Sequence, residues 1–349
     1  MPPPSDADAP YIRAMRRLRR WWPPHFAHAV LDAAAPLLIA GVGLISFQIL
    51  IAHLGSSFAE QHPLSKPADL KAEDALLHTQ LVFGAFLATN TVALIGMAMA
   101  LAGIRRFSPL LARWANVYGG VLTVIISLAL LATAATPLWS TMADTLFRAT
   151  VITTLDSIGM TRGRFSDPLG LCITISNLCF APSAAYILFY VAGLRRDFDA
   201  KMSTSPRPAS AEATRLVLSQ IYKLRTALLV AAAVMASGVA NMIVWRFWPL
   251  AFFSKDLAAD SPLKAIATAY RGLAQGSVIY QALIFTLIMI AIFFRPFIDL
   301  NDTINADTAI YDKIRRNGVI SRSLATATHW LAYLAPVATA TAATLLPGH

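Results

Sequence analysis

Side-chain amides inside long uncharged stretches are the groups in this sequence best suited to bind a small polar ligand. They are Gln48, Asn90, Asn177, Asn241 and Gln281. An amide offers both a donor and an acceptor, and it is costly to expose to lipid, so these side chains are expected to face the interior of a helical bundle. At about 1.5 Å per residue, four of them lie roughly 10 Å below the outer membrane face, with Asn90 deeper.

This shared depth predicts a polar vestibule that opens to the extracytoplasmic side and accepts a neutral or weakly charged solute. The alternative is that each amide joins neighbouring helices, at about 0.6 kcal/mol per hydrogen bond. No Asp, Glu, Lys or Arg lies near the middle of any uncharged stretch. Because proton relays and voltage sensors depend on such groups, a proton-coupled pump is disfavoured.

Histidines give a second candidate site, for haem. His53 and His78 lie at the outer ends of the first two uncharged stretches, while His28 and His329 lie near the inner face. Two opposed histidine pairs in a helical bundle are the ligands that two b-type haems require. Histidine is also stable at a membrane interface without a ligand, so the sequence predicts no cofactor.

A group of aspartates after the sixth uncharged stretch is the third candidate. It comprises Asp299, Asp302, Asp307 and Asp312. Paired carboxylates at a membrane surface can hold Mg²⁺ for a phosphate-bearing substrate. Because no second aspartate cluster exists on the same side, a solvated loop paired with Arg315 and Arg316 is the favoured interpretation. Zinc-protease, nucleophile-elbow and P-loop motifs are absent from the sequence. We therefore predict no catalytic residue and no metal site, and the chain does not read as an enzyme.

The elements that must position these residues are membrane-spanning helices. The 349 residues are 56% hydrophobic and 14% charged, whereas soluble domains are about a quarter charged. The stretch 75–104 carries no formal charge, and about twenty such residues cross a bilayer. Repetition of this pattern predicts an all-α, multi-pass bundle with seven spans. The predicted spans are 33–54, 76–104, 115–136, 169–194, 226–246, 275–295 and 325–345.

Most of the 29 lysines and arginines flank the spans on one side of the membrane. Since basic residues favour the cytoplasmic side, we expect an N-terminus inside, a C-terminus outside, and a location in a bacterial cytoplasmic membrane. Basic residues at span ends do not form the stripe typical of nucleic-acid binding.

Four connecting segments are also predicted. Residues 1–24 are a disordered start followed by a cationic amphipathic helix on anionic lipids, or alternatively a mitochondrial transit peptide. Residues 138–160 form a helix on the outer surface. Residues 196–215 form a flexible cytoplasmic linker. Ser261 and Pro262 begin a helix that runs unbroken into the sixth span.

Small residues and a weak repeat predict helix contacts. Gly96 and Ala100 form a small-xxx-small pair that joins helices within the chain or between copies of it. The sequences GIRRF (103–107) and GLRRDF (193–198) resemble each other, as a repeated hairpin or because arginine and aromatic residues commonly end spans. Cys172 and Cys179 lie about 10 Å apart on one helix, too far for a disulfide.

The sequence as a whole favours a transporter or channel-type protein for a small solute, embedded in the lipid bilayer. One alternative is a non-transporting subunit or sensor that docks a membrane-protein partner through the outer surface helix. The other is a haem-bearing electron-transfer protein.

Overall fold

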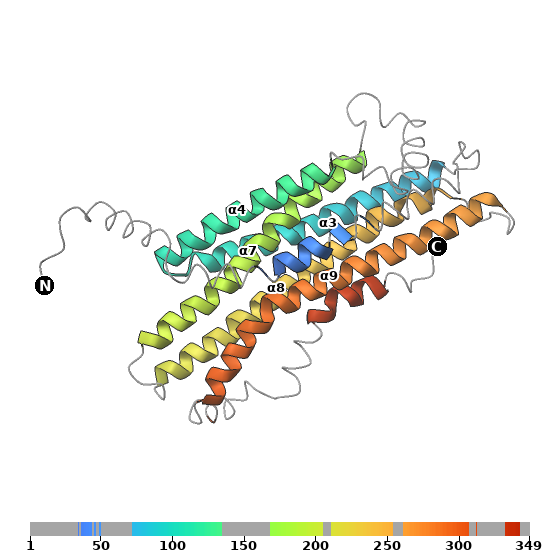
Figure 1. Cartoon of the computed structure of the whole chain (residues 1–349). Coiled ribbons are helices and arrows are strands. Elements are labelled where there is room, and N and C mark those ends of the chain that lie inside the picture. The colour runs from blue at the N-terminus through green and yellow to red at the C-terminus, as the bar shows by residue number, and fades with distance from the viewer. Residues whose placement is uncertain are drawn as a thin grey trace, which may run out of the picture.

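The computed structural model describes residues 34, 36–43, 45–46, 49, 72–134, 168–204, 211–253, 261–306, 312 and 332–342. The regular structure among these residues is helical throughout (Figure 1). The long helices are α3 (Ala72–Ile104), α4 (Pro109–Ala134), α7 (Pro168–Thr204), α8 (Ala211–Phe247) and α9 (Pro262–Ala306), and the 3-10 helix η4 (Trp248–Phe252) follows α8.

These five long helices are each apolar and long enough to cross a membrane, which confirms an all-helical, multi-pass membrane protein. They correspond to the second through sixth predicted spans. The first and seventh spans fall on segments of which only 34–49, with gaps, and 332–342 are described. The N-terminal amphipathic helix and the outer surface helix at 138–160 lie outside the described residues.

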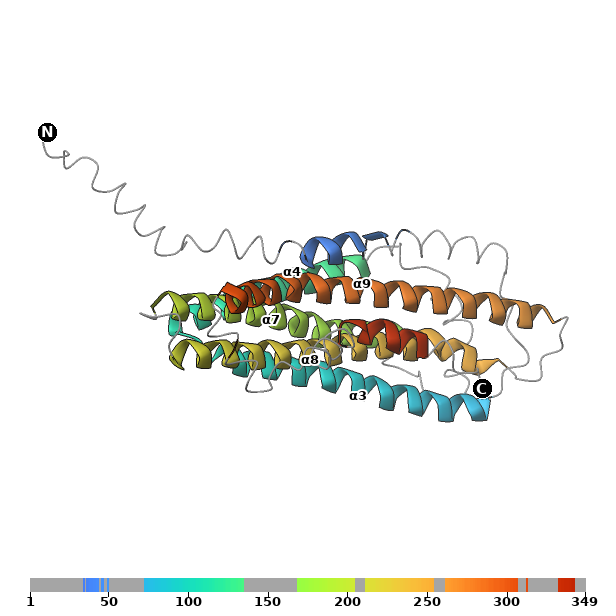
Figure 2. The same cartoon turned by 90° about the horizontal axis from the view of Figure 1, so that it is seen from below.

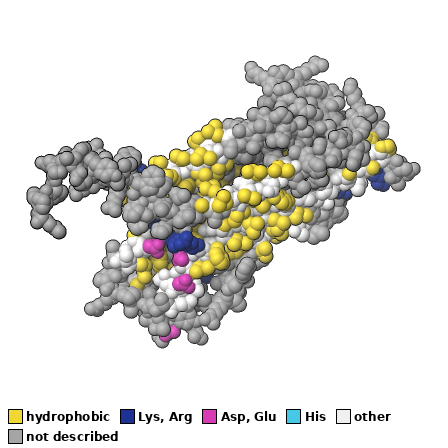
Figure 3. All heavy atoms as spheres, in the orientation of Figure 1, with side chains coloured by type: hydrophobic (Ala, Val, Ile, Leu, Met, Phe, Trp, Pro, Cys, Tyr) yellow, Lys and Arg dark blue, Asp and Glu magenta, His cyan; other side chains and the backbone are white. Residues whose placement is uncertain are grey.

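Helices α7 and α8 form the centre of the bundle. Figure 2 shows α3 and α9 on opposite sides of them, and α4 packs along α7. One continuous apolar core joins the long helices, with Ile187, Leu194, Leu224 and Phe293 fully buried. Outward-facing apolar side chains such as Leu87 remain exposed. Figure 3 shows hydrophobic side chains gathered along the middle of the face that it draws. These are the residues that lipid contacts.

Contacts at the helix ends show which connections share a side of the bundle. At one end of α3 the ring of Phe107, in the turn after the helix, stacks on the ring of Tyr190 with centroids 5.7 Å apart, so the C-terminal end of α3 lies against the C-terminal half of α7. At the opposite end the Trp248 Nε1–H donates to Thr79 Oγ1 at 3.2 Å, joining η4 to the start of α3. The helices therefore alternate in direction, as expected for successive spans. Which end faces the cytoplasm stays a prediction from charge.

The repeated glycines meet at the contact between α3 and α7. A Cβ on Gly103 would overlap the Tyr190 ring, and a Cβ on Gly193 would overlap the Phe107 ring. Gly103 thus makes room for an aromatic ring of α7, and Gly193 for an aromatic ring in the turn that follows α3. Gly96 plays the same part between α3 and α8, where a Cβ would overlap Val234. The described contact of Gly96 is therefore within the chain.

The prediction of a flexible linker at 196–215 was wrong for most of that segment, which is helical. Helix α7 continues to Thr204 and α8 already begins at Ala211. The extension of α7 is held by Asp197, whose carboxylate lies 2.6 Å from Lys201 Nζ and 3.9 Å from Lys223 Nζ of α8. Phe198 is buried as well. The polar composition of the segment concealed these packing residues.

The prediction that Ser261 and Pro262 begin a helix running into the sixth span is confirmed. The backbone N–H groups of Lys264 and Ala265 donate to Ser261 O at 3.0 and 3.3 Å, and α9 then continues for 45 residues. Its length is about 68 Å, roughly twice the hydrocarbon thickness of a bilayer. Pro296 lies inside it and removes one helical hydrogen bond. Figure 1 shows α9 bending towards its C-terminal end.

Candidate functional site

Asn241 is the centre of a polar junction between α3, α7 and α8. Its Nδ2–H donates to Thr89 Oγ1 of α3 at 2.8 Å. Its Oδ1 accepts from Ser176 Oγ of α7 at 3.1 Å. The side chain is 3% exposed, so both halves of a buried amide are hydrogen-bonded to neighbouring helices. This arrangement holds the three helices together at one depth.

Asn90 follows Thr89 directly and is bonded differently. Its Nδ2–H donates to the Phe86 carbonyl of its own helix at 2.8 Å. Its Oδ1 is buried and accepts no hydrogen bond from the residues that the structure describes, although the residue is only 5% exposed. A buried acceptor left without a donor costs about 1–3 kcal/mol. A donor brought in by water or a solute would recover that free energy.

The remaining amides of the predicted vestibule are half-buried where the structure describes them. Asn177 is half-buried on α7, next to Ser176. Gln281 is half-buried on α9, and its Oε1 is buried without a donor among the described residues. Gln48 lies outside the described residues. Asn241 is thus hydrogen-bonded to Thr89, which precedes Asn90, and to Ser176, which precedes Asn177. Gln281 makes no described hydrogen bond to this junction.

Hydroxyl groups complete the junction, and they were not predicted from the sequence. Besides Thr89 and Ser176, the Ser183 Oγ–H is shared between two carbonyls, Ala93 O of α3 at 2.7 Å and Cys179 O at 2.6 Å. Ser176 and Ser183 are seven residues apart, which places them on one face of α7. That spacing was the signal that could have found them.

The groups in this junction are neutral. Two buried charged side chains, Asp197 and Arg246, occur in the part of the chain that the structure describes, and they lie near opposite ends of the bundle. The guanidinium of Arg246 lies 4.5 Å from the Trp245 ring centroid, and Tyr270 Oη–H donates to the Arg246 carbonyl at 2.8 Å. Arg246 is the last residue of the predicted span 226–246, and its burial was not predicted from the sequence.

The four aspartates considered as a magnesium site do not lie together in one loop. Asp299 and Asp302 lie within α9 and not in a loop, and Arg195 Nε of α7 lies 2.7 Å from Asp299 Oδ2. Asp312 is exposed, and Asp307, Arg315 and Arg316 lie outside the described residues. Across the described ranges, no group of three His, Cys, Asp or Glu side chains is arranged to hold a metal ion.

Of the histidines considered for haem, the structure describes one. His78 lies near the start of α3 with an exposed side chain, while His28, His53 and His329 lie outside the described residues. Cys179 is a free, buried cysteine.

Replacing Asn241 by leucine should lower the stability of the bundle by about 1 kcal/mol, because two interhelical hydrogen bonds worth about 0.6 kcal/mol each are lost. Thermal unfolding in detergent measures the difference. The control is Thr91→Val, since the exposed Thr91 hydroxyl donates to Leu87 O of its own helix. Equal unfolding midpoints for the two variants would show that the Asn241 bonds do not hold the helices together.

Comparison of the chain with protein families, curated proteins and solved structures finds no match. The candidate site therefore stands on its geometry alone.

Proposed function

We propose that this integral membrane protein moves a small neutral solute across the bilayer, along a polar path through the junction of α3, α7 and α8. The observation that carries the proposal is the buried Oδ1 of Asn90, which accepts no hydrogen bond from the described residues. A solute hydroxyl or amide N–H in contact with that oxygen would supply the missing donor. Asn90 would then bind the solute, and Asn241 would hold the three helices around it.

The chemistry of the junction favours an uncharged solute. Its side chains are amides and hydroxyls, which stabilise a polar molecule through hydrogen bonds and offer no charge to an ion. No carboxylate or histidine is hydrogen-bonded to Asn90, Thr89, Ser176 or Asn241 in the described structure. The proposal accordingly needs no proton coupling at this site.

Asn90→Leu is expected to slow solute entry by about tenfold or more. It removes an acceptor worth about 1–3 kcal/mol to a bound donor, and about 1.4 kcal/mol corresponds to a factor of ten. The measurement is stopped-flow swelling of proteoliposomes in urea, glycerol and larger polyols. Asn177→Leu, beside Ser176 on α7, is expected to slow entry as well.

Thr91→Val is the matched control, one residue from Asn90 on the same helix but exposed to lipid. It should leave both flux and stability unchanged. Size-exclusion profiles and circular dichroism establish that every variant is folded. The proposal fails if Asn90→Leu and Asn177→Leu are both fully active, or if wild-type vesicles are no more permeable than empty ones to any of these solutes.

A further inference from the structure

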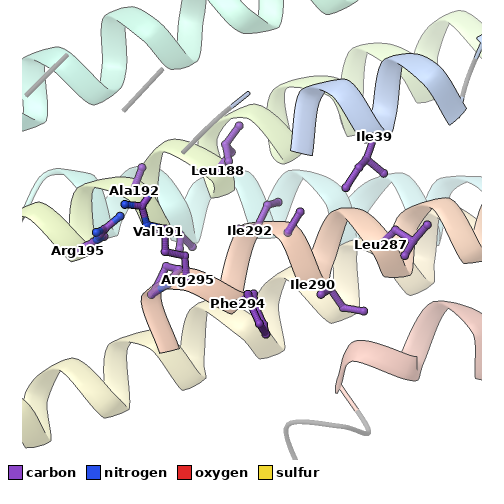
Figure 4. A pocket seen from close by; sticks show the side chains of 12 residues that line it. Ile39, Leu188, Val191, Ala192, Arg195, Leu287, Ile290, Ile292, Phe294 and Arg295 are labelled. Carbon is purple, nitrogen blue, oxygen red and sulfur yellow. The ribbon is translucent and has the colours of Figure 1, made fainter. Parts of the chain in front are cut away.

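A cavity of about 390 Å³ separates α7 from α9 along their C-terminal halves. Its wall is apolar except at one end, with Leu188, Val191 and Ala192 from α7, Leu287 and Ile290 from α9, and Ile39 from the N-terminal segment. Figure 4 shows Arg195 and Arg295 together at one end of this cavity, and Leu287 and Ile39 towards the other. One end therefore presents positive charge, and the remainder presents hydrocarbon.

The cavity opens sideways, towards lipid. On its α9 wall Leu287 is 48% exposed and Phe294 is 61% exposed, and both belong to an apolar membrane-spanning helix. An occupant can therefore enter from the bilayer without crossing water. A water-soluble ligand has no corresponding reason to bury itself against these side chains.

The dimensions match one leaflet. Leu188 and Arg195 are seven residues apart on α7, and Leu287 and Arg295 are eight apart on α9. At about 1.5 Å per residue the apolar part is about 10–12 Å long. One leaflet contributes about 15 Å of hydrocarbon. The arginines then lie at headgroup level, on the side that the charge distribution assigns to the cytoplasm.

Asp299 lies beside the arginine end of the cavity and partly neutralises it. It lies four residues after Arg295 on α9 and pairs with Arg195 Nε across the cavity mouth at 2.7 Å. Arg195 and Arg295 are the charged side chains that line the cavity itself, and Asp299 competes with an anionic ligand for Arg195. Each guanidinium has N–H donors in a planar fork that suits phosphate. Two cations fixed beside an apolar groove are complementary to a lipid with an anionic headgroup.

We infer that the cleft between α7 and α9 is a binding site for one anionic phospholipid, whose phosphate contacts Arg195 and Arg295 and whose acyl chain fills the apolar groove. This site is distinct from the polar junction around Asn90 and does not depend on the transport proposal. Basic pockets between spans on the cytoplasmic side are a common way to recognise anionic lipids.

Native mass spectrometry of the full-length protein in detergent tests the inference, with phosphatidylglycerol or phosphatidylcholine added at equal concentrations. Phosphatidylglycerol should be retained preferentially, and Arg295→Gln should weaken its retention about fivefold, the effect expected for one basic residue near the membrane surface. Ala291→Phe, which fills the groove, should weaken retention of phosphatidylglycerol without changing any charge. Asp299→Asn should strengthen it about fivefold, a gain that misfolding cannot produce.

Two matched controls separate this site from general attraction to lipid. Arg105→Gln removes an exposed charge at the end of α3 away from the cavity, and Ala98→Phe adds the same bulk at an exposed position of α3. Both should leave retention unchanged. Equal retention of the two lipids, equal effects of Arg295→Gln and Arg105→Gln, or no gain in Asp299→Asn would overturn the inference. So would full displacement of phosphatidylglycerol by inorganic phosphate combined with no effect of Ala291→Phe, since the site would then take free phosphate.

Discussion

Gly96→Leu is expected to separate α3 from α8 and to lower the stability of the protein by about 3 kcal/mol or more. Gly96 is buried, and even a Cβ at this position would overlap the side chain of Val234, itself only 1% exposed. Close approach through small residues is what holds spans together in lipid, where no hydrophobic driving force acts between them. The expected result is little monodisperse protein, with a lowered unfolding temperature for what remains.

Gly84→Leu provides the control on the same helix. Gly84 is exposed, and a Cβ there would meet nothing within 4 Å. The substitution should be neutral or stabilise α3 slightly, since leucine favours a helix by up to about 1 kcal/mol over glycine.

A double substitution tests the contact itself. Val234→Ala removes the atoms that a Cβ at position 96 would overlap. Gly96→Ala combined with Val234→Ala should therefore be less destabilised than the sum of the two single variants. Additive losses would show that Val234 is not what limits the size of residue 96.

Trp248→Ala is expected to cost about 3–5 kcal/mol, the range for deleting a buried aromatic side chain. Trp248 is 1% exposed and fixes η4 on the beginning of α3. Its ring meets the Phe83 ring edge-on, with centroids 5.8 Å apart, and its indole N–H donates to Thr79. Its loss leaves a cavity and releases the turn after α8. Thermal and denaturant unfolding in detergent would measure both effects.

Trp248→Phe and Thr79→Val divide that loss into parts. Each removes the hydrogen bond at a cost of about 1 kcal/mol, and Trp248→Phe keeps most of the packed ring. Because both variants remove the same bond, their combination should cost less than the sum of the two. If Trp248→Phe is as unstable as Trp248→Ala, the ring contact with Phe83 does not contribute as described.

The membrane-spanning helices were predictable because a long charge-free run has a direct physical consequence. A backbone in hydrocarbon must satisfy its own hydrogen bonds, and a helix does so within one segment. The polar ends were not predictable in the same way. Residues 211–225 of α8 carry several charges, so a search for charge-free runs misses them. Their alanine, leucine, glutamate, lysine and arginine residues favour a helix, and Ala213 and Val217 pack into the core.

The candidate site was partly predictable for a related reason. Asn90 and Asn241 stand out because amides are rare in apolar helices, and the structure buries both. Their partners do not stand out, because Thr89 and Ser176 are ordinary in membrane helices and could equally bond their own backbone. Which hydroxyl meets Asn241 depends on how three helices are rotated about their axes, and the sequence does not contain that information in any local pattern.

The length of α9 also has a mechanical consequence. It reaches past the hydrocarbon on both sides, with Tyr270 packed beside Arg246 near one end and Asp299 tied to α7 near the other. A tilt about its contact with α8 would displace these two ends in opposite directions, as in a lever. Long helices accommodate a thinner bilayer by tilting. A change in bilayer thickness would then strain the Tyr270–Arg246 contact and the Asp299–Arg195 contact at the same time. A single helix would thereby couple the two membrane surfaces.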